Sequence, residues 1–172
     1  QVNYRGYPGS QGRPCEKGLR KDARAAWAEA RLTHEAKDIV LLGKSLGGGV
    51  AIGLVAELQE KGEMPRALVV ESTFTAAVNV AAELVWWLPV RWFMRNRFNS
   101  MLFVSKLKLP VLVIHGSCDE MIGVHHAHEL AAAIDKAKLI VVEGAEHNDM
   151  LLADPAAWEA FRQVTRLSRK YK

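Results

Sequence analysis

A serine between two glycines is the first feature of this sequence that could do chemistry. Residues 43 to 47 read GKSLG, which fits the G-x-S-x-G pattern in which a strand turns sharply into a helix. The turn holds the serine hydroxyl clear of the sheet, and the glycines leave room for it. The backbone N–H of Leu46 would face the oxyanion formed when a carbonyl is attacked. The pattern predicts Ser45 as a nucleophile and Leu46 as one oxyanion donor.

Other interpretations of this glycine-rich stretch are weaker. A phosphate loop needs a glycine where Asp38 stands, and a dinucleotide fingerprint starting at Gly47 reaches Ile52 where it needs its last glycine. Both interpretations fail. A purely structural alternative, in which Ser45 is only a serine in a tight turn before a helix, stays open.

A serine hydroxyl becomes a good nucleophile only when a base takes its proton, and that base needs an orienting carboxylate. His34 precedes the serine in a polar helical stretch, and His115 ends a predicted strand, where we expect it to be buried. His147 lies in EGAEHND, between the last predicted strand and the last predicted helix. A loop there could reach Ser45, so we predict His147 as the base.

Three further histidines, His125, His126 and His128, open one predicted helix. We interpret them as a polar first turn rather than a metal site. No cysteine or convincing carboxylate is spaced in the sequence to complete tetrahedral ligation. We predict no metal and no cofactor.

The predicted acid is Asp119, in HGSCDEM, because the glycine-led turn after a predicted strand is loop-like. Glu120 is adjacent but would point elsewhere. The rival is Glu71, at the end of the strand that follows the serine's helix, and it stays open as an alternative.

The elements that must position these residues alternate along the chain. Strands are predicted over 37–43, 66–73, 109–116 and 138–144, and helices over 47–62, 123–138 and 154–167. Such alternation favours parallel pairing, hence an α/β fold with a mostly parallel sheet and helices on both faces. We interpret residues 1–172 as one domain with a helical excursion at about 74–104.

The excursion carries three tryptophans between Trp86 and Trp92. One interpretation is a helical pair packed over the sheet. The other is a lid over an apolar substrate, which hints at an acylated substrate presented at a membrane surface.

Composition narrows the class of protein. With 172 residues, 49% hydrophobic and 24% charged, the chain has the composition of a globular domain and excludes disordered and collagen-like classes. The net charge of +4 is mild, and we interpret the basic tail RLSRKYK, residues 166–172, as a solvated helix end rather than a nucleic-acid or anionic-lipid contact. Two cysteines fit a reducing compartment; a cytoplasmic or membrane-associated location and the oligomeric state stay open.

Several stretches resemble the α/β-hydrolase-domain (ABHD) esterase-like serine hydrolases. The opening NYRGYPGSQGRPCEKGLRKDARAAW is similar to that group's opening motif, and its later motifs are similar to GKSLGG, VESTF, LPVLVIHGSCDEMI and GAEHND. The resemblance implies that Ser45 is the nucleophile, His147 the general acid and base, Asp119 the orienting carboxylate and Leu46 an oxyanion donor. Four positions depart from the group's pattern, namely Pro8, Cys15, Ser72 and Gly123.

The resemblance also implies that the chain is N-terminally incomplete. It opens without methionine, as though partway along a strand, and the loop expected to supply a second oxyanion N–H would lie upstream. A strand expected between the opening strand and residues 37–43 is missing, so we expect a central sheet edge to be unpaired.

These observations predict a serine hydrolase that cleaves a carboxylic ester, thioester or amide of a small-molecule or acylated substrate through an acyl-enzyme. The alternatives are a non-catalytic α/β-hydrolase-like binding or scaffold protein, or an inactive fragment. An acyl-protein thioesterase would use the same residues. We expect no nucleic-acid partner and consider a peripheral membrane contact.

Overall fold

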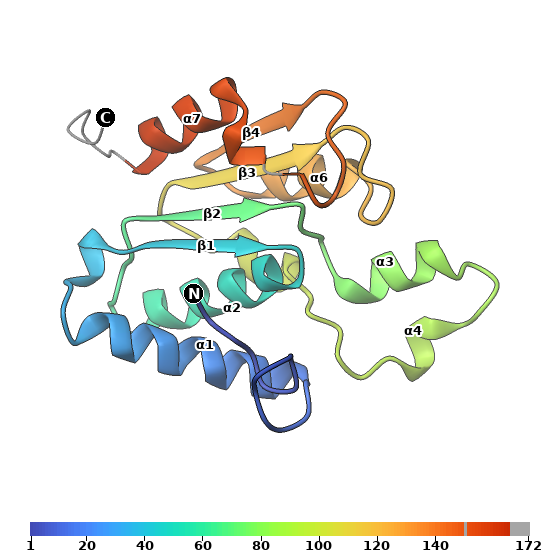
Figure 1. The fold of residues 1–172 in the computed structure, drawn as a ribbon, viewed down its shortest axis with the longest axis horizontal. Helices are drawn as coiled ribbons and strands as arrows, with labels where there is room; N and C mark the ends of the chain where they lie inside the picture. The colour runs from blue at the N-terminus through green and yellow to red at the C-terminus, as the bar shows by residue number, and fades with distance from the viewer. Residues whose placement is uncertain (150, 166–172) are drawn as a thin grey trace.

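Four parallel strands form one sheet at the centre of the computed structural model, which describes residues 1–149 and 151–165 (Figure 1). They are β1 (Val40–Lys44), β2 (Ala67–Glu71), β3 (Val111–Gly116) and β4 (Ala137–Val142), paired in that order. The predicted α/β fold with a parallel sheet is confirmed. Because all strands run the same way, the loops after their carboxyl ends meet at one edge of the sheet.

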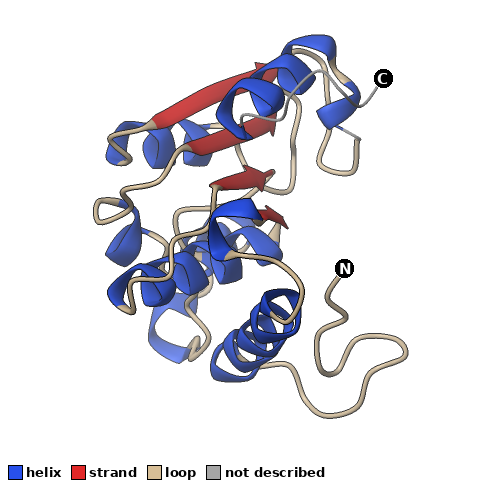
Figure 2. Cartoon of the chain, turned by 90° about the vertical axis from the view of Figure 1, so that its left-hand side faces the viewer, coloured by secondary structure: helices blue, strands red, loops and turns tan. Residues whose placement is uncertain are grey.

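Helices cover both faces of the sheet, as predicted (Figure 1, Figure 2). Leu68 and Val70 of β2 face a core made with α2 (Leu46–Glu60), α5 (Met101–Val104) and α6 (His125–Ala133). Val69 faces the opposite core, made with α7 (Pro155–Thr165). The two central strands, β2 and β3, are thus buried on both faces, which explains their nearly continuous apolar runs.

The helix after Ser45, α2, is apolar almost all round because it lies between two layers. Ile52 and Val55 pack toward the sheet, whereas Val50 and Leu54 pack against α1 (Glu16–Arg31). This double burial fixes the helix that follows the serine.

The segment predicted as a helical excursion contains three short helices, α3 (Ala77–Leu84), α4 (Val90–Phe93) and α5. Figure 1 shows α3 and α4 projecting beyond the carboxyl ends of the strands. The interpretation of a helical pair packed over the sheet is wrong, since α3 and α4 project past it (Figure 1) and Trp86 and Trp92 are 83% and 86% exposed. The excursion is anchored instead at its two ends, where Phe74 and Phe98 are buried.

The expected opening strand is also wrong. The segment before α1 turns back on itself through Gly6, Gly9 and Gly12, all at positive φ. Its backbone groups bond locally, for example Tyr7 N–H to Tyr4 C=O at 3.1 Å. Within the described residues no strand precedes β1, which pairs there with β2 alone, as the predicted unpaired edge requires.

The last helix begins as its sequence suggests. Asp154 Oδ1 accepts hydrogen bonds from the N–H groups of Ala156 and Ala157, both at 2.9 Å, and Pro155 takes the first helical position. The basic tail, residues 166–172, lies outside the described residues. In the part of the chain that is described, every helix is too short or too polar to cross a membrane.

Candidate active site

Ser45 occupies a strained turn between β1 and α2. Its φ of 51° and ψ of −122° lie outside the regions that a serine ordinarily adopts. A Cβ at Gly43 would lie 2.5 Å from the carbonyl oxygen of Gly47, so the strand and the helix approach too closely for a side chain there. The turn is held on both sides, since Ser45 N–H donates to the carbonyl of Glu71 and the Thr73 hydroxyl donates to the carbonyl of Ser45, each at 2.8 Å.

The structure brings the three predicted side chains together. His147 Nε2 lies 3.2 Å from Ser45 Oγ, and His147 Nδ1 lies 2.8 Å from Asp119 Oδ2. His147 stands on the loop between β4 and α7, and Asp119 on the loop after β3. All three therefore sit at the carboxyl edge of the sheet, and the distances fit a hydroxyl, a base and an orienting carboxylate.

The Asp119 carboxylate is buried, and hydrogen-bond donors surround it. Its Oδ1 accepts from the N–H groups of Met121 and Ile122 at 3.0 and 2.8 Å, and its Oδ2 faces His147. These donors satisfy a charge that burial would otherwise make costly. They also fix the direction in which Oδ2 points.

His115 is a part of this site that the sequence analysis did not use. It is fully buried, and its Nε2 lies 2.7 Å from the Ile122 carbonyl and 3.2 Å from Asp119 Oδ2. Burial lowers the pKa of the His115 imidazole below its ordinary value, which favours the neutral form. A neutral ring that donates from Nε2 ties the end of β3 to the loop that carries Asp119. In the sequence, the sign that His115 belongs to the site is its place as a polar residue at the end of an apolar strand.

The rival acid, Glu71, has another partner. Its Oε1 lies 2.8 Å from Lys44 Nζ, which also donates to the carbonyl of Asp149 at 2.9 Å. Glu71 thus forms an ion pair with Lys44, whereas Asp119 is the carboxylate that contacts His147. Glu120, the neighbour of Asp119, is exposed.

The remaining histidines lie elsewhere. His34 bonds to the hydroxyl of its neighbour Thr33 on an exposed turn, and His128 is exposed on α6. His125 and His126 face Glu83 from α3, a carboxylate that the sequence spacing did not reveal. The argument that these histidines lack a carboxylate partner is therefore wrong.

The turn also carries a backbone N–H group that can stabilise negative charge. Leu46 is the first residue of α2, where N–H groups have no acceptor within the helix and the helix dipole favours negative charge. This placement suits the predicted oxyanion donor. The second donor, expected from residues upstream, stays a prediction.

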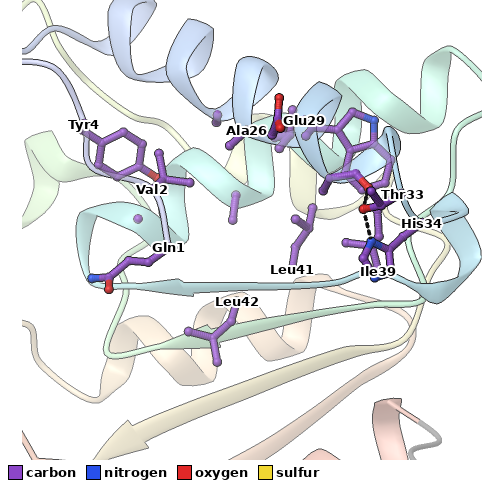
Figure 3. Close-up of a pocket in the computed structure, with 16 residues that line it drawn as sticks. Gln1, Val2, Tyr4, Ala26, Glu29, Thr33, His34, Ile39, Leu41 and Leu42 are labelled. Carbon is purple, nitrogen blue, oxygen red and sulfur yellow. Dashed lines mark hydrogen bonds between the residues drawn. The ribbon is translucent and has the colours of Figure 1, made fainter.

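A well-defined cavity lies apart from these three side chains. It measures about 550 Å³ and runs along β1, between the N-terminal residues and α1. Figure 3 shows Val2 and Tyr4 on one side of it and Leu41 and Ile39 on the strand side. Ser45, Asp119 and His147 do not line it. We attribute this cavity to the unpaired edge of β1 rather than to the chemistry of Ser45.

The chain has relatives of similar sequence in Mycobacterium tuberculosis and Homo sapiens. No family model matches it. It is 38% identical over 155 residues to an uncharacterised protein of Mycobacterium tuberculosis, matching 88% of this chain and 53% of that protein. It is 30% identical over 153 residues to the Homo sapiens alpha/beta hydrolase domain-containing protein 17B, matching 87% of this chain and 50% of that protein. The chain thus spans about half the length of the curated relatives it matches.

Solved structures agree on the fold. An α/β hydrolase from Vibrio vulnificus superposes with a TM-score of 0.74 at 20% identity, covering 92% of this chain and 61% of that one. A thermophilic esterase from Thermogutta terrifontis gives 0.66 at 16% identity, covering 95% and 78%. A Paleococcus ferrophilus monoacylglycerol lipase gives 0.59 at 17% identity, covering 92% and 77%. The chain therefore has the α/β-hydrolase fold and resembles the α/β-hydrolase-domain proteins.

Proposed function

We propose that this protein is a serine hydrolase that cleaves a carboxylic ester, thioester or amide through an acyl-enzyme intermediate. The observation that carries the proposal is the hydrogen-bonded series from Ser45 through His147 to a buried Asp119, mounted on a strained turn between a strand and a helix. The α/β-hydrolase fold, which esterases and a lipase share, supports it. The reaction needs no cofactor.

In the proposed reaction, His147 Nε2 takes the proton of Ser45 Oγ while that oxygen attacks the carbonyl carbon. The resulting imidazolium is stabilised through Nδ1–H by Asp119, and the Leu46 N–H faces the developing oxyanion. His147 then returns its proton to the leaving group. Water, deprotonated by the same imidazole, attacks the acyl-enzyme and releases the acid and the free serine.

The substrate class we propose is an acylated compound met at a membrane surface. Residues 84–93, here called the tryptophan segment, expose six large apolar side chains: Leu84, Trp86, Trp87, Leu88, Trp92 and Phe93. Tryptophan favours the boundary between lipid and water, and Arg91, Arg95 and Arg97 lie in or just after the segment. Projecting beyond the edge that carries Ser45, the segment could rest on a bilayer near the site (Figure 1).

A fluorophosphonate probe tests the chemistry directly, because it phosphonylates only an activated serine. We expect labelling of the whole chain at Ser45, lost in Ser45→Ala and in His147→Ala. Ser105→Ala, an exposed serine on α5's C-terminal side, is the matched control and should keep the labelling. A folded protein that takes no label overturns the proposal and leaves the non-catalytic scaffold or the inactive fragment.

An acyl-protein thioesterase would share every group named above. Matched oxygen esters and thioesters of increasing acyl length separate the two activities. A thioester preference that grows with acyl length, measured as kcat/KM, indicates the thioesterase, whereas equal rates for both indicate a general esterase.

A further inference from the structure

Three potential metal ligands from two distant parts of the chain lie close together where the tryptophan segment begins. Glu83 lies in the last turn of α3, and His125 and His126 are the first two residues of α6. His125 Nε2 lies 3.3 Å from Glu83 Oε1, and His126 Nε2 lies 3.5 Å from Glu83 Oε2. Each carboxylate oxygen thus faces one imidazole nitrogen, and all ligand atoms lie within 4.8 Å of one another.

These separations suit a metal ion. Zinc lies about 2.0–2.1 Å from histidine nitrogen and carboxylate oxygen. In a tetrahedron with edges set by those lengths, two ligand atoms are about 3.4 Å apart. The distance from Glu83 Oε1 to His125, 3.3 Å, and that from Glu83 Oε2 to His126, 3.5 Å, are each close to that edge. Because they belong to different oxygens, binding through one oxygen requires the half-exposed carboxylate to rotate.

The buried histidine is held by contacts at its other ring nitrogen. The ring of His126 is 1% exposed, and its Nδ1 lies 2.9 Å from the Thr75 hydroxyl and 3.4 Å from the Thr75 N–H. Asn79 donates to the same hydroxyl at 3.2 Å. Histidine ligands usually donate their second ring nitrogen to such a partner, which frees the other nitrogen for the metal. For His126 to bind a metal through Nε2, Nδ1–H would donate to the closer Thr75 oxygen in place of accepting from the Thr75 N–H, and Nε2 would then carry its lone pair toward Glu83.

That nitrogen is buried and makes no close hydrogen bond among the described residues; its polar neighbour is Glu83 Oε2 at 3.5 Å. A buried polar atom whose nearest partner is this distant is uncommon, and a metal ion would satisfy it. We propose that Glu83, His125 and His126 form a binding site for a divalent transition metal, with zinc as the reference ion and water completing the tetrahedron. One carboxylate and two imidazoles are ligands that zinc accepts.

The metal would join the excursion to the sheet layer. Glu83 stands one residue before the tryptophan segment, whereas α6 packs on β3 and β4 through Ala127 and Leu130. A bound ion would therefore hold the start of the tryptophan segment against α6 and the sheet. This inference does not depend on the proposed serine chemistry.

The test measures zinc affinity of the metal-stripped whole chain by competition with a chromogenic chelator. We expect one strongly bound zinc per chain, and a visible spectrum typical of four-coordinate cobalt when Co²⁺ replaces it. Glu83→Gln and His125→Ala should each weaken zinc binding at least about tenfold, the loss typical even for outer partners of a ligand. Both side chains are about half exposed, at 47% and 53%, so these changes spare the core.

His128→Ala is the matched control, because His128 lies on the same helix, is exposed and is outside the cluster. It should keep the affinity of the unmodified chain, and so should Ser45→Ala. Zinc should also raise Tm of the unmodified chain and leave that of His125→Ala unchanged. If the unmodified chain binds no more zinc than His125→Ala, or if His128→Ala weakens binding as much, the proposal fails and the cluster is only an ion pair.

Discussion

At the scale of single residues, Asp119 and Glu71 make a direct comparison. Both are buried carboxylates near the carboxyl edge of the sheet, but Asp119 contacts His147 and Glu71 contacts Lys44. Under the proposed mechanism, Asp119→Asn should lower kcat about 10⁴-fold, because the amide no longer favours the required tautomer of His147. Glu71→Gln should lower it far less. Ester hydrolysis at saturating substrate measures both, and equal losses would contradict the assignment of Asp119.

His115 gives a pH dependence of stability. Burial lowers its pKa, and its ring faces Asp119, the Ile122 carbonyl and, through Asp119, His147. The unfolded chain, with the ordinary histidine pKa of about 6.5, binds the proton more readily than the folded chain. The free energy of unfolding should therefore fall as pH drops below about 6.5, by up to about 1.4 kcal/mol per pH unit for this group.

Urea unfolding at a series of pH values measures that slope. His115→Phe removes the group and should flatten the slope, whatever it does to stability at neutral pH. His128→Ala, which removes an exposed histidine, should leave it unchanged. Equal slopes for the unmodified chain and His115→Phe would show that the buried imidazole does not govern the acid response.

At the scale of elements, Lys44 connects the turn that carries Ser45 to the loop that carries His147. Its Nζ bonds to both the Glu71 carboxylate and the Asp149 carbonyl. Lys44→Met should misplace His147 and lower kcat about tenfold or more with little change in KM, since small displacements of a catalytic group are costly.

The same change also leaves the Glu71 carboxylate buried and unpaired, which costs stability by itself. The double variant Lys44→Met with Glu71→Gln removes that charge, so it should regain stability while kcat stays low. Lys138→Met, which removes an exposed lysine on β4, is the control. Recovery of kcat in the double variant would show that the loop does not depend on Lys44.

The elements differ in how far the sequence predicts them. β2 and β3 are buried on both faces, so their apolar runs identify them, and the local pattern around Ser45 predicts its turn. The predicted opening strand is wrong, because a strand needs a partner and the glycines there turn the chain instead. The meeting of Glu83 with His125 depends on the path of the excursion, which no local pattern encodes.

At the scale of the whole molecule, the unpaired side of strand β1 is a surface through which chains can associate. Within the described residues β1 pairs on one side only, and Leu42 on it is 51% exposed beside an apolar cavity. Exposed apolar edges promote association between chains. We expect the chain of 172 residues to self-associate with rising concentration, and Leu42→Lys to reduce this in light scattering. Leu32→Lys, an exposed leucine after α1, should not; an equal effect would implicate general charge instead of the edge.

The tryptophan segment is the second such surface, and the proposed contact with a bilayer can be tested there. The segment lies at one end of the molecule (Figure 1). It exposes six large apolar side chains, and three arginines lie in it or just after it. We expect the chain to sediment with vesicles that contain phosphatidylserine, and more weakly with neutral phosphatidylcholine vesicles or at high salt, because arginine attraction to anionic lipid is screened. Replacing Trp86 and Trp92 with serine should weaken binding at least about tenfold, or about 1.4 kcal/mol, because both indoles lose their place at the interface. Leu32→Ser, on a distant exposed site, is the control, and an equal loss there would place the membrane contact elsewhere on the molecule.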